Sequence, residues 1–228
     1  MSKNDPPTGA SAQIVTGLLK LSLVLRHEAW QASGQRGLTP TQSQILALMA
    51  SLGAISVSTV ARQLSITKGT ASQAVSTLER KELLRKDADS SDGRAVALKL
   101  TRKGRREAQR SAQWPNVVVA AAHSIPSGDQ GAFLRGLTAL IRSLQEQDAV
   151  PTSRMCAQCR FFRPNLYPGQ EKTHHCAYIK APIADVDLRI DCGEMEPADA
   201  ELQPLLTEAL LGGTSIDPSL LEGEGPSR

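Results

Sequence analysis

The sequence predicts a mainly α-helical protein with one small β-hairpin and a separate C-terminal module that is stapled by a metal. Apolar residues recur at helical spacing through most of residues 12–147, and two strand-like runs flank a polar turn near residue 90. All four cysteines lie in one stretch, in the pattern C-x2-C-x16-C-x15-C. With 228 residues, we expect a helical domain over 1–150, a cysteine module over 151–197, and a short helix with a disordered tail over 198–228.

The first expected helix covers residues 12–32 and is apolar over more than one stripe, because Leu23 and Val24 add to the main apolar face. Such a helix packs either inside its own domain or against a second subunit, and the pattern leaves both open. The next helix begins at Thr39-Pro40, with Thr39 as the N-cap and Pro40 at the first helical position.

Two short helices over residues 56–64 and 68–81 are joined by a tight turn, and Thr67 has the side chain to cap the second helix. Helices joined in this way form a helix-turn-helix. Residues 83–86 and 95–100 suit strands, and the turn between them is rich in Asp, Ser and Gly. The order predicts a winged helix-turn-helix with a β wing.

Two helices are expected after the hairpin. Thr101 is expected to cap the first, which Pro115 interrupts. The second spans residues 127–147 and opens with a capping box between Ser127 and Gln130. Its apolar face consists of Phe133, Leu134, Leu137, Leu140, Ile141 and Leu144. Because this face is broader than one small domain can bury, we expect this helix and the one over 12–32 to form a dimerisation domain.

Charge is distributed unevenly along the chain. Residues 60–110 contain thirteen Lys and Arg against six Asp and Glu, a net charge of +7. From residue 115 onward, nine basic residues stand against fifteen acidic ones. A basic block in an otherwise neutral-to-acidic chain indicates either a phosphate-binding surface or an ordinary solvated face.

Three motifs carry a family resemblance: V-A-R-Q-L-S-I-T-K-G-T-A-S over residues 60–72, L-E-R-K over 78–81, and D-G-R-A-V-A-L-K-L-T over 92–101 followed by K-G-R over 103–105. In these motifs the chain resembles the MarR family of bacterial winged-helix regulators. The resemblance implies an obligate homodimer that binds double-stranded DNA at a pseudo-palindromic operator. It also implies a repressor that is relieved by a small-molecule effector or by oxidation.

The residues expected to contact DNA lie at the start of the recognition helix or at the wing tip: Thr67, Lys68, Gly69, Thr70, Ser72, Gln73, Asp92 and Arg94. Gly69 leaves room for close approach to the DNA backbone. Arg94 is suited to a narrow minor groove, with Asp92 orienting its guanidinium. Ser76 and Lys81 are expected at phosphates, and the basic run over residues 102–110 is interpreted as mostly a solvated helix face.

Four cysteines are the expected metal ligands: Cys156, Cys159, Cys176 and Cys192. The N-terminus lacks the apolar core of a signal peptide and no apolar run is long enough to span a bilayer, so we expect a cytoplasmic protein without membrane contact. Clustered thiols in a reducing compartment bind metal more often than they form disulfides.

The cysteine spacing, with Phe161 two residues after the C-x-x-C, resembles that of the high-potential iron–sulfur proteins. This resemblance favours a 4Fe–4S cluster, and zinc stays open as the alternative. Four aromatic residues are interleaved with the cysteines and either form a small core or shield a cluster: Phe161, Phe162, Tyr167 and Tyr178. His174 and His175 are expected to hydrogen-bond a sulfur or to face solvent, and Pro164, Pro168 and Pro182 predict loops rather than strands.

The sequence contains no nucleotide-binding glycine motif, no H-E-x-x-H and no G-x-S-x-G, so an enzyme is not expected. The leading interpretation is a DNA-binding transcriptional regulator whose metal centre senses redox state or iron. Two alternatives stay open: an electron-transfer or redox protein that uses the four-cysteine centre, and a regulator with a purely structural zinc site.

Overall fold

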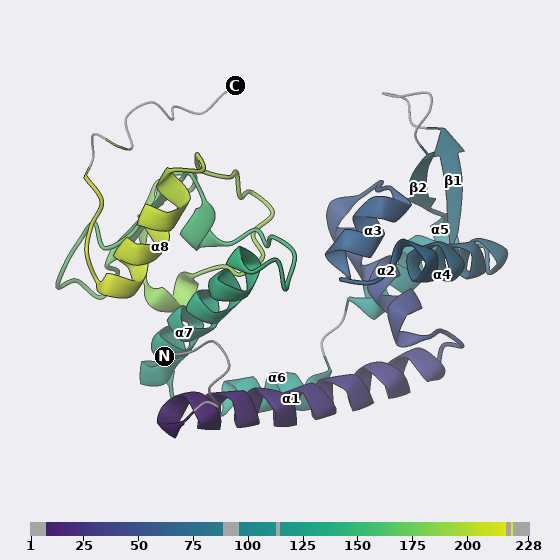
Figure 1. Ribbon diagram of the computed structural model, residues 1–228, viewed down its shortest axis with the longest axis horizontal. Coiled ribbons are helices and arrows are strands. Elements are labelled where there is room, and N and C mark those ends of the chain that lie inside the picture. The colour runs from purple at the N-terminus through teal and green to yellow at the C-terminus, as the bar shows by residue number, and fades with distance from the viewer. Residues whose placement is uncertain (1–7, 89–95, 113–114, 218–219, 221–228) are drawn as a thin grey trace. The chain divides into compact units, whose positions relative to one another are not determined.

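The computed structural model describes residues 8–88, 96–112, 115–217 and 220 (Figure 1). Contacts divide the chain into two compact units, Met1–His123 and Ser124–Arg228, each with its own hydrophobic core. The helix that begins at residue 127 therefore packs with the cysteine segment, whereas the sequence alone assigned it to the first domain. Within the described ranges, no helix has both the length and the apolar character that crossing a membrane requires.

The long helix α1 (Gly9–Gly34) opens unit 1 and buries only one side chain, Ser33. Leu19, Leu23 and Trp30 keep 62, 56 and 69% of their surface exposed. Ser33 Oγ donates to Ser43 Oγ at 2.9 Å and so fixes the end of α1. Of the two packing modes that the sequence left open, burial of α1 in its own domain is therefore not observed.

The remaining elements of unit 1 are a helix-turn-helix and a hairpin that share one core with the helix that follows them, and a last helix that buries no side chain. Their bounds are α2 Pro40–Leu52, α3 Val57–Gln63, α4 Lys68–Arg80, β1 Leu84–Ala88, β2 Val96–Leu100, α5 Arg102–Ser111 and α6 Asn116–His123. β1 and β2 pair antiparallel with Leu84 opposite Leu100, and Ile55 bridges to Leu98. Fully buried side chains from these elements form the centre of the core: Ile45, Leu46, Val60, Val75, Leu78 and Leu98.

Helix starts in unit 1 follow the predicted capping chemistry. Thr39 and Gln42 form a capping box, in which the Gln42 amide donates to Thr39 Oγ1 at 3.2 Å and the Thr39 amide donates to Gln42 Oε1 at 3.3 Å. Thr67 Oγ1 accepts from the Thr70 amide at 3.1 Å. The predicted caps at Thr39 and Thr67 are confirmed, and they set where α2 and α4 begin.

The junction between the hairpin and α5 explains why a glycine stands at position 104. The Gly104 amide donates to Thr101 Oγ1 at 2.9 Å, and the Thr101 amide donates to the Leu83 carbonyl at 3.1 Å, so the predicted cap at Thr101 is also confirmed. A Cβ added to Gly104 would lie 1.7 Å from the Leu83 oxygen. Only glycine therefore allows α5 to approach the strand this closely.

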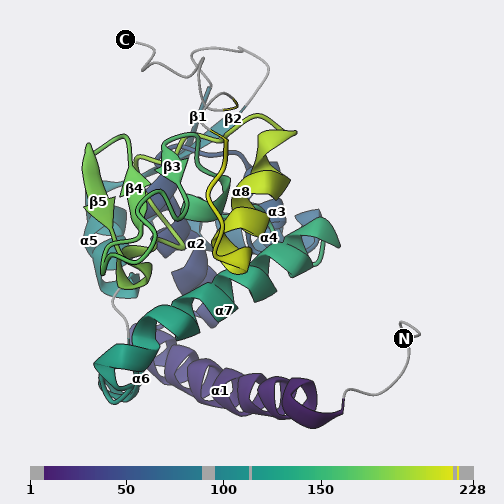
Figure 2. The ribbon, with the colours of Figure 1, turned by 90° about the vertical axis from the view of Figure 1, so that its left-hand side faces the viewer.

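Unit 2 consists of two helices around a small, mostly irregular module (Figure 2). The bounds are α7 Ser127–Glu146, η1 Cys156–Gln158, β3 Phe162–Arg163, β4 His174–Cys176, β5 Ala181–Ile183, η2 Asp185–Asp187 and α8 Leu202–Gly212. The three strands form an antiparallel sheet in the order β3-β4-β5. Pro182 was predicted in a loop but lies in β5, which is an edge strand, where a missing amide donor is tolerated.

The core of unit 2 joins the cysteine segment to α8. Phe162, Leu206 and Leu210 are at most 2% exposed and are members of one cluster that includes Ala157. Asn165 holds the end of α8, because its Nδ2 donates to the carbonyls of Ala209 at 2.7 Å and Thr214 at 2.9 Å. The helix that the sequence predicted from residue 198 begins at Leu202 in the structure.

Helix α7 differs from its prediction in two respects. No side-chain cap is present at its start, since Gln130 Nε2 donates instead to the Ile125 carbonyl at 3.0 Å; the predicted capping box was wrong. Its buried residues are Gly131, Thr138 and Arg142, not the predicted apolar face. Phe133, on that apolar face, is 48% exposed.

Candidate nucleic-acid interface and cysteine cluster

The N-terminal half of α4 presents an uncharged and basic surface to solvent. Its exposed side chains are the six predicted for this helix, Thr67, Lys68, Gly69, Thr70, Ser72 and Gln73. The buried face of the same helix carries Ala71, Val75 and Leu78. The 3.6-residue period therefore separates a core face from a polar face that is free to reach a groove.

Gly69 has no packing role inside unit 1. A Cβ at this position would meet only Thr67 Oγ1, at an ordinary contact distance of 3.9 Å. Gly104, in contrast, is enclosed by its own unit. The absence of a side chain at Gly69 thus opens space on the outer surface of α4.

The wing is described up to Ala88 and again from Val96. Asp87 stabilises its base by accepting from Arg85 at 3.2 Å and from Lys99 at 3.4 Å. Asp92 and Arg94, predicted at the wing tip, lie outside the described residues.

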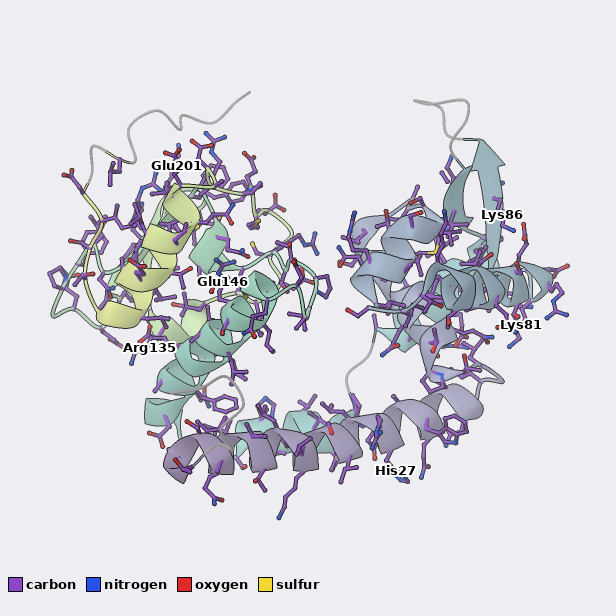
Figure 3. The ribbon with its side chains drawn as sticks, in the orientation of Figure 1. His27, Lys81, Lys86, Arg135, Glu146 and Glu201 are labelled. Carbon is purple, nitrogen blue, oxygen red and sulfur yellow. The ribbon has the colours of Figure 1, made fainter. Side chains whose placement is uncertain are left out.

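Two lysines of the basic stretch donate to backbone carbonyls of unit 1; one of them, Lys81, is labelled in Figure 3. Lys81 Nζ donates to the Gly37 carbonyl at 2.6 Å and to Gln42 Oε1 at 2.9 Å, and its predicted contact with a phosphate stays a prediction. Lys103 Nζ donates to the Lys81 carbonyl at 3.0 Å. These contacts join distant segments, which sequence patterns do not reveal.

The family profile described as MarR family matches residues 36–95, the segment from the end of α1 to the wing. This segment is therefore similar to the MarR family. Among curated proteins, none is similar enough to the chain to count as a match.

Several solved structures are similar to part of this chain. Streptococcus pneumoniae FabT in complex with DNA is similar, with 23% identity, a TM-score of 0.52, and 59% of this chain and 98% of that chain covered. BldR from Sulfolobus solfataricus has 24% identity, a TM-score of 0.49, and 63% and 99% coverage. A probable transcriptional regulator from Pseudomonas aeruginosa has 26% identity, a TM-score of 0.46, and 57% and 96% coverage.

The cysteine cluster lies in unit 2, after the segment over residues 36–95 that the family profile matches. Cys156 opens the turn η1, Cys159 follows it, and Cys176 ends β4 opposite Phe162. Cys192 is fixed by its amide, which donates to the Arg154 carbonyl at 2.8 Å. All four thiols are free, and only Cys159 is fully buried.

Backbone donors approach two of the sulfurs. The Arg189 amide donates to Cys156 Sγ at 3.3 Å. Burial raises the pKa of Cys156 to about 11, and this amide partly opposes the shift. Burial also raises the pKa of Cys159, against backbone hydrogen bonds from Phe161 and Glu196.

The donor set fits a four-thiolate centre in number and in backbone support. Charges on Cys159, Cys192 and Cys176 all contribute to the raised pKa of Cys156, so the four thiols are neighbours. Among the described residues, however, no group of three or more His, Cys, Asp and Glu is placed to hold a metal ion. Charges on neighbouring thiols affect one another over distances well beyond the roughly 2.3 Å of a zinc–sulfur bond, so this effect on the pKa does not require the four sulfurs to surround one ion. The four thiols are therefore neighbours, but among the described residues they are not placed around one common ion.

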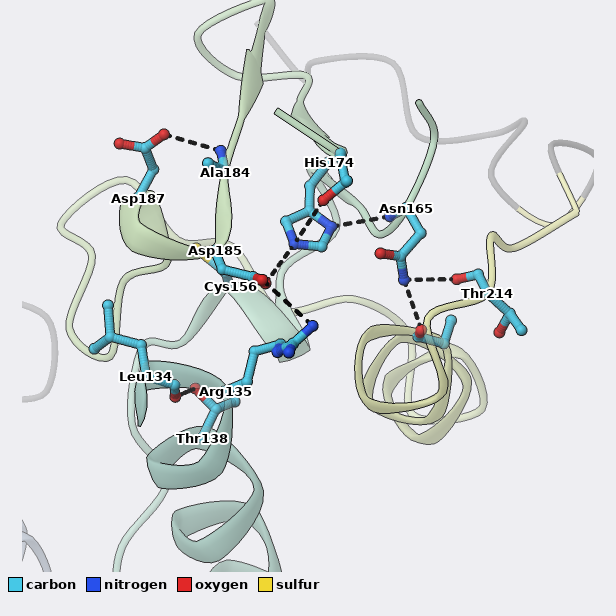
Figure 4. A network of polar contacts seen from close by, with 12 residues as sticks. Leu134, Arg135, Thr138, Cys156, Asn165, His174, Ala184, Asp185, Asp187 and Thr214 are labelled. Carbon is cyan, nitrogen blue, oxygen red and sulfur yellow. Dashed lines mark hydrogen bonds and ion pairs between the residues drawn. The ribbon is translucent and has the colours of Figure 1, made fainter. Parts of the chain in front are cut away.

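The two histidines beside Cys176 are engaged elsewhere. His174 is 1% exposed; its Nδ1 accepts from the Asn165 amide at 2.9 Å, and its Nε2 lies 2.9 Å from Asp185 Oδ1 (Figure 4). His175 Nδ1 lies 3.2 Å from the Tyr167 hydroxyl. The predicted sulfur or solvent contact is therefore wrong for His174. Its partners come from separate loops, and no sequence signal links them.

Proposed function

We propose that the protein is a sequence-specific DNA-binding transcription regulator, a repressor that acts as a homodimer on a pseudo-palindromic operator. The observation that carries the proposal is the exposed polar face of α4 on a MarR-type winged helix. The surrounding stretch, residues 60–110, has a net charge of +7, which favours phosphate. A similar fold, that of FabT, was solved in complex with DNA.

The DNA proposal is tested by selecting duplexes from a random pool with the full chain at moderate salt. We expect one pseudo-palindromic sequence to be enriched. The Arg94→Ala variant should bind it more weakly by about 1–3 kcal/mol, the range for loss of one specific arginine contact. No enrichment over random duplex, with a folded protein, would refute the proposal.

The homodimer is supported by the apolar surfaces that unit 1 and unit 2 leave uncovered. On α1, Leu19, Leu21 and Leu23 are each more than half exposed. An uncovered apolar helix of this length is typical of a surface that a partner covers. We expect sedimentation to give a dimer at micromolar concentration and Leu21→Glu to give a monomer. Lys20→Glu, which alters a position that is already charged, is the control.

We further propose that Cys156, Cys159, Cys176 and Cys192 bind one metal centre per chain, with a 4Fe–4S cluster favoured and structural zinc as the alternative. The support is the full set of four free thiols and the Arg189 amide directed at Cys156 Sγ. When bound, a cluster supplies a redox-sensitive charge inside unit 2.

Absorption spectra and iron, sulfide and zinc contents of anaerobically purified protein distinguish these alternatives. A brown protein with about four irons per chain supports the cluster, and a colourless protein with one zinc supports the staple. Operator affinity of the holo, oxidised and Cys159→Ser forms then tests sensing. Equal affinities in all three would refute regulation by the metal, and cluster reduction without DNA binding would favour the electron-transfer alternative.

A further inference from the structure

Helix α7 presents a polar stripe to the cysteine module. Gly131, Arg135, Thr138 and Arg142 follow one another at steps of four, three and four residues, so they share one face. Three of them, Gly131, Thr138 and Arg142, are buried. The apolar residues of α7 lie on its other faces and are at least partly exposed. The contact between α7 and the module is therefore made by polar and small side chains.

The first polar link, the Arg142 anchor, joins α7 to the C-x-x-C turn. Arg142 is 8% exposed, and when the Gln158 side-chain amide is oriented with its oxygen toward Arg142, the guanidinium donates to that oxygen. In this orientation Gln158 Nε2 donates to the Ser153 carbonyl at 3.2 Å, so both amide atoms have partners. Gln158 is 2% exposed and stands between Cys156 and Cys159. The charge of Arg142 is paired within α7 by Glu146 Oε1 at 3.1 Å, and Gln158 is its link to the C-x-x-C turn, so displacement of the turn removes one hydrogen-bond partner of a buried guanidinium.

The second link, the Asp185 anchor, joins α7 to the strand that carries Cys176. Arg135 Nη1 lies 3.3 Å from Asp185 Oδ2, and Asp185 Oδ1 lies 2.9 Å from His174 Nε2 (Figure 4). His174 is two residues before Cys176 in β4. The carboxylate of Asp185 thus bridges α7 to the second half of the cysteine cluster.

Helix α7 is also closely packed against the turn η2 at Gly131, next to the two polar links. A Cβ added to Gly131 would lie 2.7 Å from Asp185 Cβ. Asp185 belongs to η2, so this turn is held against α7 by a steric contact as well as by Arg135. Packed interfaces of this kind shift as units rather than deform gradually.

We propose that α7 is coupled to the state of the cysteine cluster through the Arg142 and Asp185 anchors. This inference rests on the proposed function, in which the same helix contributes an apolar face to the dimer. Each anchor reaches a residue one or two positions from a cysteine, and the two arginines are seven residues, about two turns, apart on one face. A change at the cysteines therefore reaches α7 at two points and reorients the helix or loosens it.

The test measures hydrogen–deuterium exchange in the full-length protein with and without Cys159→Ser. In the wild-type background we expect this substitution to speed exchange in residues 155–197 and, by about tenfold, in α7. Arg142→Met and Arg135→Gln remove one anchor each, and Asp129→Asn changes an exposed carboxylate in the first turn of α7 as the matched control. Arg135 is 41% exposed, so its replacement provides a mild second variant if Arg142→Met does not fold.

With both anchors removed, Cys159→Ser should still loosen residues 155–197 but change exchange in α7 by less than about twofold. The Asp129→Asn background should respond as the wild type does. The coupling is overturned if Cys159→Ser leaves exchange in α7 unchanged in the wild-type background. It is also overturned if Cys159→Ser speeds exchange in α7 equally when both anchors have been removed. Metal content is measured on the same samples, so absence of bound metal refutes the proposed cofactor separately.

Discussion

Replacing Gly104 with alanine should destabilise unit 1 by a predictable amount. The new Cβ would stand 1.7 Å from the Leu83 carbonyl oxygen, 2.7 Å from its carbon and 3.3 Å from its Cα. All three atoms belong to backbone, so no side chain can rotate away. The Leu83 oxygen also accepts from the Thr101 amide, so moving α5 outward disturbs the cap that starts this helix.

Three contributions set the magnitude. Overpacking against fixed atoms costs about 1–3 kcal/mol, and loss of the Thr101 cap costs about 1 kcal/mol. Because alanine has a higher helix propensity than glycine, the same substitution also stabilises the helix by about 0.5–1 kcal/mol. The net expectation is a loss of about 2–3 kcal/mol in the free energy of unfolding unit 1.

Hydrogen exchange of the slowest amides in α2 and α4 measures this loss without assuming that both units unfold together. Gly69→Ala is the matched control, because its Cβ meets nothing closer than 3.9 Å. We expect the control to be neutral or stabilising by up to about 1 kcal/mol. A Gly104→Ala protein within about 0.5 kcal/mol of the wild type would refute the steric reasoning.

Three further predictions concern Gly69, Lys81 and Asn165. Gly69→Ala should weaken operator binding although it does not destabilise the fold, as measured by fluorescence anisotropy. Lys81→Met should destabilise unit 1 by about 1–3 kcal/mol because two acceptors lose their donor, whereas Lys68→Met should leave stability unchanged and reduce the salt slope of DNA binding by about one. Asn165→Ala should destabilise unit 2 by about 2–4 kcal/mol, seen as faster exchange in α8, because two carbonyls lose their donor.

The winged helix was accessible from sequence because its signals are local. Thr39, Thr67 and Thr101 each cap a helix within three residues, and these bonds form as expected. The cysteine cluster was equally visible, since four rare residues fall in one stretch. Local chemistry fixed the element starts, and the spacing of apolar residues fixed the core face of α4.

Contacts between distant segments could not be predicted in this way. Lys81 bonds to a carbonyl 44 positions away, and His174 bonds to Asp185 across two strands. The buried stripe of α7, which contains Gly131 and Arg142, was not predicted for the same reason. A hydrophobic pattern identifies a face that needs covering but does not identify what covers it.

The long-range closure of unit 2 has a consequence for biosynthesis. Thr207 Oγ1 donates to the Ala157 carbonyl 50 positions earlier, and Asn165 reaches forward 49 positions to Thr214. The cysteine segment therefore has no complete core until α8 has left the ribosome. At about 5–20 residues per second, unit 1 emerges roughly 5–20 s before that point. Each newly made chain thus has a folded unit 1, the half proposed to bind DNA, while the half proposed to regulate it is still being synthesised.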